Sequence, residues 1–459
     1  MAADDAQDHE GASAFELDAD LVQAVREALE QGARERVLEL VEPLHEADLA
    51  DLLEQLDADE RAMLVRVLGR DLDPYALTEL EEGVRDEVLE AMAPEDLAAA
   101  VKELDADDVV YLVEDLDEDE KARVLQALDP VERVAVEKSL TYPEDTAGRL
   151  ARHEIVTAPP FWTVGQMIDA MREAEELPDD FHDVVLIDPK VEPVGLVPLS
   201  RIMAAPRATR LEDIKREEMH VLKADTSVED VAYAFQKYRM LTAPVVDADG
   251  RLVGVIEFED AAELIDDEAE EDLKLLAGVG DEELSDSVFE TAKARFPWLF
   301  VNLLTAILAS IVIAQFDRVI EQIVALAVLM PIVASMGGNA GTQTLTVAVR
   351  ALATRDLTPA NAWRIIRREA LVGLANGLAF AVIVSGVGLI WYGDPTLGLV
   401  LAAAMVINLV AAALAGILIP IGLDKLGADP ALASGTFVTT VTDVVGFFAF
   451  LGLAGALML

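Results

Sequence analysis

One apolar stretch of the chain carries polar side chains that could contact an ion. Its sequence, MPIVASMGGNAGTQTLTVAV (330–349), contains a G-x-x-x-G pair at Gly337 and Gly341. The pair by itself predicts close packing between membrane helices. However, Asn339, Gln343 and Thr346 follow one another at i, i+4 and i+7, so a helix would place them on one face. Close packing does not require that polar stripe, although Asn339 and Gln343 could also form hydrogen bonds between helices.

A carboxylate lies inside the last apolar stretch. Asp443 shares a helical face with Thr436, Thr439 and Thr440, about 12 residues past the start of that stretch at Ala431. At 1.5 Å per residue this is ~18 Å into the span. An ionisable group at that depth costs several kcal/mol unless water, a partner or an ion meets it. The membrane portion offers no buried basic partner, so a water-filled cation path is the better interpretation.

Five apolar stretches after residue 296 are long enough to span a bilayer, which requires about 20 residues each. They are approximately Pro297–Phe316, Ile320–Val349, Ala370–Ile390, Leu397–Ile421 and Ala431–Leu459. The connection between the second and third carries Arg350, Arg355, Arg364, Arg367 and Arg368, and the connection before the fifth carries Lys425. By the positive-inside rule both connections are cytoplasmic. The N-terminus is then cytoplasmic and the C-terminus extracellular.

The remainder of the chain is strongly acidic. From Pro297 to Leu459 there are eight Asp and Glu against seven Lys and Arg, so almost all of the formal net charge of −51 precedes Pro297. That charge repels phosphates and excludes a nucleic-acid partner. It suits divalent cations or solubility in concentrated salt. The chain has no cysteine, so thiolate metal sites and thiol nucleophiles are excluded. Residues 1–15 are expected to be a disordered acidic tail without the features of a signal peptide.

Two different patterns precede the membrane portion. Residues 16–145 show short amphipathic helices with acidic N-caps, as in HEADLADLLEQL (45–56), which predicts an α-helical superhelix. Residues 146–262 alternate strand and helix in two copies, each with a helix start at T-V or S-V and a V-G strand. In the second copy an Asp-Gly turn at Gly250 joins two β-branched runs and predicts a hairpin. These copies resemble a tandem pair of α/β CBS domains.

Taken together, the motifs resemble the MgtE family of magnesium channels and transporters. The resemblance rests on HEADLADLLEQL (45–56), LTYPEDTAGRL (140–150), the CBS pair, PIVASMGGNAGTQTLT (331–346) and the block from Asp429 to Gly446. It implies a homodimer in a lipid membrane whose pore is lined by the second and fifth spans. Asp443 would hold a hydrated Mg²⁺, Asn339 and Thr346 would line the cytoplasmic half of the path, and Asp429 would lie at the mouth. The sequence departs from the family at Thr436, where many relatives have proline.

The segment 263–295 begins with an acidic helix that resembles the plug helix of the family, followed by the membrane portion at 296–459. The expected ligands of regulatory Mg²⁺ are acidic residues of this region and of the second CBS copy: Glu229, Asp260, Glu263, Glu268, Glu271 and Asp272. Unneutralised carboxylates repel, and bridging Mg²⁺ would draw the cytoplasmic parts together and close the pore. Solvation in a salt-adapted organism is the competing interpretation of each carboxylate.

Two other functions remain open. One is a broader divalent transporter that also carries Co²⁺, Mn²⁺ or Zn²⁺, although a membrane portion without Cys or His disfavours soft metals. The other is a membrane-anchored CBS sensor that transports nothing, for which Asp443 would have no use. The resemblance also allows ATP at the CBS pair, but the sequence identifies no nucleotide ligands. The chain contains no Walker motif or nucleophile triad, so it is not predicted to be an enzyme.

Overall fold

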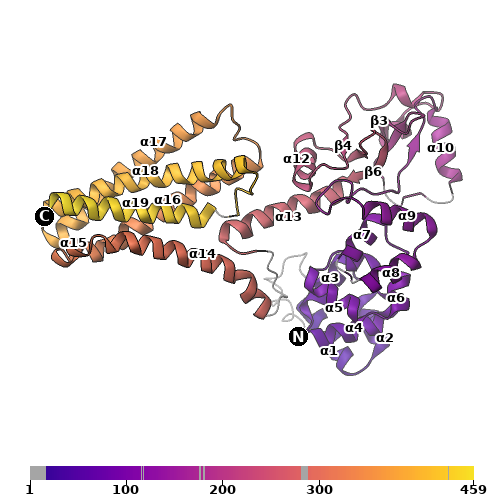
Figure 1. Cartoon of the computed structure of the whole chain (residues 1–459). Coiled ribbons are helices and arrows are strands. Elements are labelled where there is room, and N and C mark those ends of the chain that lie inside the picture. The colour runs from indigo at the N-terminus through magenta and orange to yellow at the C-terminus, as the bar shows by residue number, and fades with distance from the viewer. Residues whose placement is uncertain are drawn as a thin grey trace, which may run out of the picture. The chain divides into compact units, whose positions relative to one another are not determined.

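The computed structural model describes residues 17–114, 116, 118–174, 177–178, 181–280, 288–432 and 434–459. The acidic tail predicted for residues 1–15 therefore lies outside the described residues. The chain forms two compact units, which divide between Asp266 and Asp267 and are described separately below. Figure 1 shows their elements along the chain.

The first unit begins with short amphipathic helices, as the repeating leucines predicted. They are α1 (Ala19–Glu30), α2 (Arg34–Val41), α3 (Glu46–Gln55), α4 (Ala58–Leu68), α5 (Glu82–Ala91), α6 (Pro94–Ala100), α7 (Ala106–Glu114), α8 (Glu118–Ala127) and α9 (Pro130–Ser139). Leu52 and Leu53 of α3 are fully buried in one continuous core. Asp57 and Asp129 begin α4 and α9 with reciprocal capping boxes, so the predicted acidic N-caps are confirmed there.

The same unit continues with two copies of a strand–helix motif. The first contains β1 (Thr157–Ala158), α10 (Val164–Glu173), β2 (Asp183–Ile187), β3 (Pro193–Pro198) and α11 (Leu199–Ala204). The second contains β4 (Leu222–Lys223), α12 (Val228–Tyr238), β5 (Thr242–Val246), β6 (Leu252–Glu257) and α13 (Phe258–Ala277). In each three-stranded sheet the first pairing is parallel and the second antiparallel. The predicted hairpin is present, with Gly250 at φ +81°.

A segment that precedes the first copy packs into the second. Ala147 and Ala151 are buried in the hydrophobic core of the second copy, together with Phe235 and Ile256. The backbone of Arg152 forms a bridge with Val255 of β6, with N–O distances of 2.8 and 3.0 Å. The chain therefore pairs with β6 of the second sheet before it forms the strands of the first sheet. This fixes the position of Arg152 between the helical part and the CBS pair.

The second unit contains the membrane portion. Its helices are α14 (Val288–Ala314), α15 (Asp317–Gln322), α16 (Ala325–Ala353), α17 (Ala362–Tyr392), α18 (Pro395–Leu426) and α19 (Ser434–Leu457). Within the described ranges, five helices are long and apolar enough to cross a membrane, as predicted. Two predicted boundaries were wrong. Residues 320–322 belong to the separate short helix α15, and Arg364, Arg367 and Arg368 lie on the first turns of α17 rather than in a loop.

The helix α18 forms the centre of this bundle and contacts α16, α17 and α19 (Figure 1). Its buried residue Asn408 donates a hydrogen bond from Nδ2 to the carbonyl of Val333 on α16, at 2.8 Å. A Cβ atom added at Gly337 would lie 2.2 Å from this Nδ2, and one added at Gly446 would lie 2.7 Å from it. Both glycines therefore leave room for one buried amide where three helices meet.

Candidate ion pathway and regulatory sites

The polar stripe predicted on the second span is present on α16, and it is exposed in the single chain. Asn339, Gln343 and Thr346 are all exposed, whereas Gly337 and Gly341 are buried against neighbouring helices. The Nδ2 atom of Asn339 lies 3.5 Å from the Oγ atom of Ser335 on the same helix. The Thr346 hydroxyl donates to the carbonyl of Thr342. The glycines and the polar residues thus occupy different faces, because their spacing differs around the helix.

The helix α19 lies directly beside α16 and carries the second polar row. A Cβ atom at Gly341 would lie 2.5 Å from Val438, and one at Gly338 would lie 3.9 Å from Thr439. The hydroxyls of Thr439 and Thr440 donate to backbone carbonyls of their own helix, including that of Thr436. These threonines are partly exposed, so hydroxyl oxygens remain able to accept hydrogen bonds from water.

Asp443 lies in the same region of α19. It is half-buried, and it has no hydrogen bond or ion pair to any described residue. Because α19 begins at Ser434 rather than Ala431, Asp443 lies about 14 Å along the helix, somewhat less deep than predicted. A carboxylate inside the apolar part of a bundle without a protein partner requires water or a cation.

Asp429 is exposed in the connection between α18 and α19, where its Oδ1 accepts a hydrogen bond from the backbone N–H of Ala431 at 2.8 Å. Asp272 near the end of α13 belongs to the same unit. Burial raises the pKa of Asp272, and the negative charge of Asp429 raises it further. The two carboxylates are thus close enough to repel each other. A cation between them would relieve that repulsion.

The remaining acidic residues predicted for regulation are distributed along and beside α13. Asp260 lies in its first turn, Glu263 and Glu271 are exposed, and Glu268 is half-buried. Glu229 is exposed in the first turn of α12, and its side chain makes no hydrogen bond or ion pair in the described part of the chain. Two of these predicted residues belong to sites with distant parts of the chain. Asp260 lies beside Arg152, and Asp272 interacts with Asp429.

Three carboxylates of the helical part and one arginine, none of them predicted from the sequence, lie around Asp260. Asp105, Asp107 and Asp108 present oxygen atoms that lie within 4.8 Å of one another. The guanidinium of Arg152 is 2.6 Å from Asp260 and 3.1 Å from Asp107. The LDADD spacing (104–108) at the start of α7 is the only sequence signal for this cluster, and similar acidic helix starts recur throughout this part of the chain.

Burial changes the acidity of this cluster. It raises the pKa of Asp107 well above its usual value and that of Asp108 to about 6, although the charge of Arg152 opposes both shifts. Burial also raises the pKa of Asp260. For Arg152, burial lowers the pKa, but the charges of Asp260 and Asp107 outweigh it and raise the pKa above the usual value. The arginine therefore stays cationic, and its positive charge offsets the repulsion among the carboxylates.

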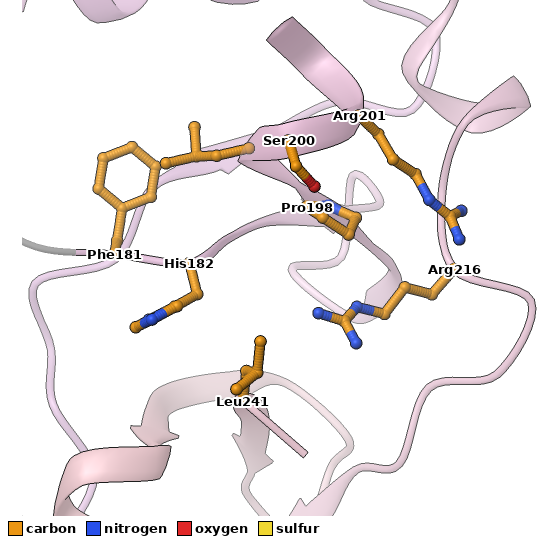
Figure 2. Close-up of a pocket in the computed structure, with 8 residues that line it drawn as sticks. Phe181, His182, Pro198, Ser200, Arg201, Arg216 and Leu241 are labelled. Atoms are coloured by element: carbon orange, nitrogen blue, oxygen red, sulfur yellow. The ribbon is translucent and has the colours of Figure 1, made fainter. Parts of the chain in front are cut away.

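A separate pocket lies where the first CBS copy meets Leu241 of the second copy. It has a volume of about 470 Å³, and its lining residues are Phe181, His182, Pro198, Leu199, Ser200, Arg201, Arg216 and Leu241 (Figure 2). The Arg216 guanidinium pairs with the buried carboxylate of Asp183 at 2.9 Å. Arg201 donates to the carbonyls of Ile214 and Lys215. Two arginines and one histidine thus line a single pocket of a strongly acidic chain.

These features define the class of the protein. It is a multi-pass membrane protein with tandem CBS domains, and a polar helix face in its membrane portion carries a carboxylate. Three family profiles match the chain. One described as a divalent cation transporter covers residues 330–453, one described as the MgtE intracellular N domain covers 44–145, and one for the CBS domain covers 211–267. The last match falls on the second copy, which contains the predicted hairpin at Gly250.

Known proteins are similar over most of the chain. A magnesium transporter MgtE from Enterococcus faecalis is 33% identical over 70% of this chain and 71% of that protein. Another from Thermus thermophilus is 31% identical over 95% of this chain and 98% of that protein. The chain therefore belongs to the MgtE family of magnesium transporters. A solved cytosolic domain of the Mg²⁺ channel MgtE in complex with ATP is 28% identical, covers 53% of this chain and 99% of that one, and has a TM-score of 0.49.

Proposed function

We propose that this protein conducts Mg²⁺ along a path between α16 and α19 of two identical chains. The observation that carries the proposal is the exposed stripe of Asn339, Gln343 and Thr346 beside Asp443, which has no hydrogen bond or ion pair to a described residue. Polar side chains at membrane depth face a bundle interior or a water-filled cavity, because lipid cannot satisfy them. A second copy that faces the stripe would enclose the water that these groups require.

In this proposal Asp443 binds the transported ion through water. Mg²⁺ dehydrates reluctantly and is bound by one or two carboxylates while it keeps several waters. Two copies of Asp443, one from each chain, would supply that pair. The hydroxyls of Thr439 and Thr440 and the amide of Asn339 would accept hydrogen bonds from the water shell of the ion. Asp429 would raise the local concentration of cations at the mouth.

The proposed orientation places the N-terminus in the cytoplasm and the C-terminus outside. Arg350, Arg355, Arg364, Arg367 and Arg368 are located at the ends of α16 and α17 that are joined by a short connection. Lys425 lies at the end of α18. With five crossings, these three helix ends share one side, which the positive-inside rule assigns to the cytoplasm.

The proposed regulation is negative feedback by cytoplasmic Mg²⁺. Asp272 and Asp429 repel each other, as the raised pKa of Asp272 indicates. Mg²⁺ bound between such carboxylates would favour the arrangement that brings α13 to the mouth of the path. A ligand that binds one arrangement better shifts the population towards it. High internal Mg²⁺ would therefore close the path.

The test is Mg²⁺ flux into proteoliposomes for the native protein, for Asp443→Asn and for Asp317→Asn, at low and high internal Mg²⁺. Asp317 is an exposed carboxylate at the start of α15 and serves as the matched control. The expected result is a loss of flux only in Asp443→Asn, with native flux suppressed by internal Mg²⁺. Equal flux in all three proteins would remove Asp443 from the path.

The same assay separates the alternatives. Competition by Co²⁺, Mn²⁺ or Zn²⁺ as strong as that by Mg²⁺ itself would favour the broader transporter. No flux in any correctly folded variant would favour the membrane-anchored sensor. Selectivity for Mg²⁺ is expected because the side chains proposed to line the path offer oxygen ligands from carboxylate, hydroxyl and amide groups. Such ligands suit a hard cation.

We also propose that the pocket in Figure 2 binds an adenine nucleotide such as ATP. Phe181 and Leu241 offer apolar surface for a base, and Arg201, Arg216 and His182 offer positive or hydrogen-bonding groups for phosphates. In a chain with a net charge of −51, an anion would be repelled from most other surfaces. Titration calorimetry of the full chain with ATP should give binding that weakens at least about tenfold in Arg201→Ala. Unchanged affinity in that variant would exclude this pocket.

A further inference from the structure

Arg152 occupies the centre of the junction between the helical part and the CBS pair. Its Nη1 atom lies 2.8 Å from Glu259 and 3.9 Å from Asp105, and its other two nitrogen atoms contact Asp260 and Asp107 at 2.6 and 3.1 Å. Asp105 and Asp107 belong to the start of α7, whereas Glu259 and Asp260 belong to the first turn of α13. One guanidinium thus joins carboxylates of two domains.

The arginine is held in this position by its backbone. Residue 152 pairs with Val255 of β6 through two hydrogen bonds, and a Cβ atom added at Gly254 would lie 2.6 Å from the Arg152 carbonyl oxygen. The side chain is mostly buried, with 19% of its surface exposed, and the Asp107 and Asp260 side chains are 12% and 17% exposed. The guanidinium is therefore a fixed cation in a partly dehydrated site.

Without this cation the junction would hold five carboxylates at close range, since Asp108 adds its charge to the other four. Removal of one partner from a buried ion pair is strongly destabilising, because the remaining charges stay uncompensated. Apart from Arg152, no basic side chain forms an ion pair with these five residues in the described part of the chain. The two parts would then separate, or a free cation would take the place of the guanidinium.

We propose that Arg152 is a built-in cation that keeps the helical part docked on the CBS pair without Mg²⁺. The inference rests on the proposed feedback by cytoplasmic Mg²⁺ and assigns which part of the cytoplasmic region responds to it. A tethered guanidinium is present at a fixed, high local concentration, so a free ion must displace it in order to bind. Docking at this junction is then insensitive to Mg²⁺.

The carboxylates near the path differ in this respect. Asp272 and Asp429 are two acidic residues of the second unit, and neither forms an ion pair with any described residue. Their repulsion is left for a free cation to neutralise. The response to Mg²⁺ is therefore assigned to the Asp272 end of α13, and Arg152 acts as a positioning residue at its other end.

The experiment measures the distance between the two domains in the full chain. Because the native chain has no cysteine, Glu90→Cys on α5 and Met203→Cys on α11 provide two labelling positions for energy transfer. Both residues are exposed, and Met203 is 78% exposed. The distance is followed as Mg²⁺ is added to chelator-treated protein at constant ionic strength, so that general screening does not change.

The expected result is a short distance at all Mg²⁺ concentrations when Arg152 is present. In Arg152→Gln the distance should be long in chelator and short in millimolar Mg²⁺, because the divalent ion replaces the lost charge. Docking of this variant should require at least about tenfold more Mg²⁺ than docking of Arg152→Lys, which keeps the charge but loses the bidentate geometry. Arg207→Gln, which breaks an exposed ion pair with Asp169 inside the first CBS copy, should leave the Mg²⁺ dependence unchanged.

Two outcomes would overturn the proposal. One is a distance in the native pair that depends on Mg²⁺ as strongly as in Arg152→Gln, and the other is an Arg152→Gln distance that stays short in chelator. If Arg152→Gln fails to fold, Asp107→Asn combined with Arg152→Gln removes one of the repelling carboxylates, and the distance in this double variant should still be long in chelator and short in millimolar Mg²⁺. Flux suppression by internal Mg²⁺ is measured separately, so a failure of the feedback leaves the distance result intact.

Discussion

At the scale of single residues, the buried amide of Asn408 explains two glycines that the sequence presented only as parts of motifs. Gly337 and Gly446 lie on different helices, yet both leave the space that this amide occupies. Asn408 is fully buried, and one of its two polar atoms bonds the carbonyl of Val333. The amide therefore fixes the approach of α16 and α19 to α18.

We expect Gly446→Ala to destabilise the membrane unit by about 1–3 kcal/mol, the usual cost of extra volume in a packed interior. The added methyl group would lie 2.7 Å from the Asn408 amide. A thermal unfolding scan in detergent should show a lower midpoint. The double variant Gly446→Ala with Asn408→Ala should recover most of the loss, and Gly386→Ala, where a Cβ meets nothing within 4 Å, is the control. An unstable double variant would contradict the steric explanation.

The acidity of Asp108 predicts a pH dependence at the same scale. Burial raises its pKa to about 6, above the unfolded value, so the folded protein binds the proton more strongly. Its contribution to stability is fully present below about pH 4 and is lost as the pH rises through about 6. In chelator, Asp108→Asn should match the native unfolding midpoint at about pH 4 and exceed it by about 2–4 °C at pH 8. A constant difference across this range would show that the Asp108 charge is not the cause.

At the scale of elements, α13 is the helix that combines two kinds of acidic site. Its first turn contributes Asp260 to an arginine, whereas its later part brings Asp272 near Asp429. Arg152 holds the first site, whereas Asp272 and Asp429 at the later site form no ion pair with a described residue. The element is therefore expected to respond to cations at one end and to be held at the other.

Replacement of Asp272 by Ala should weaken the suppression of Mg²⁺ flux by internal Mg²⁺. Without that carboxylate Asp429 loses the acidic neighbour with which it would share a cation, so the concentration for half suppression should rise by at least about tenfold. Asp266→Ala on the same helix is the matched control, because Asp266 is exposed and makes no ion pair in the described residues. Joint replacement of Asp260, Glu263, Glu268, Glu271 and Asp272 by Ala should abolish the suppression. If neither change affects it, α13 has no part in the feedback.

At the scale of the whole molecule, the exposed polar stripe of α16 requires a partner, and two copies of this chain would supply one. The native chain has no cysteine, so single introduced cysteines report proximity between copies and access from each side of the membrane. The dimer and the orientation can thus be tested with the same set of variants.

We expect Asn339→Cys to form a disulfide between two copies in the membrane under mild oxidation, because the proposed path brings the two stripes face to face. Val382→Cys on α17 is the control, since Val382 is 76% exposed and is expected to face lipid. Non-reducing electrophoresis distinguishes the two. Equal cross-linking at both positions would argue against a dimer built around α16.

The orientation predicts which cysteines a membrane-impermeant maleimide reaches in intact cells. Glu321→Cys at the end of α15 should be labelled from outside, and Lys425→Cys at the end of α18 should be labelled only after the membrane is opened. Both residues are exposed in the structure. The reverse pattern would place the N-terminus outside and would remove the cytoplasmic feedback.

The sequence by itself determined the elements, because their signals are local. Helical and strand periodicity, acidic N-caps and five apolar stretches predicted the helical part, the CBS pair and the membrane helices. Asp443 and the stripe of Asn339 and Thr346 were found in the same way, since a polar residue in an apolar run is visible without a fold. The predicted helix ends differ from the structure at α15 and at the start of α17, because these ends depend on packing.

Only the tertiary structure decided which distant residues meet. Arg152 lies more than a hundred residues before Glu259 and Asp260 in the chain. Its local sequence does not distinguish it from an arginine on the surface. Pairing of this segment with β6 of the second sheet brings Arg152 to the carboxylates of α7 and α13. Asn408 is likewise one amide in a long apolar helix until Gly337 and Gly446 surround it. Contacts of this kind depend on the closure of long loops, and no local pattern of residues encodes them.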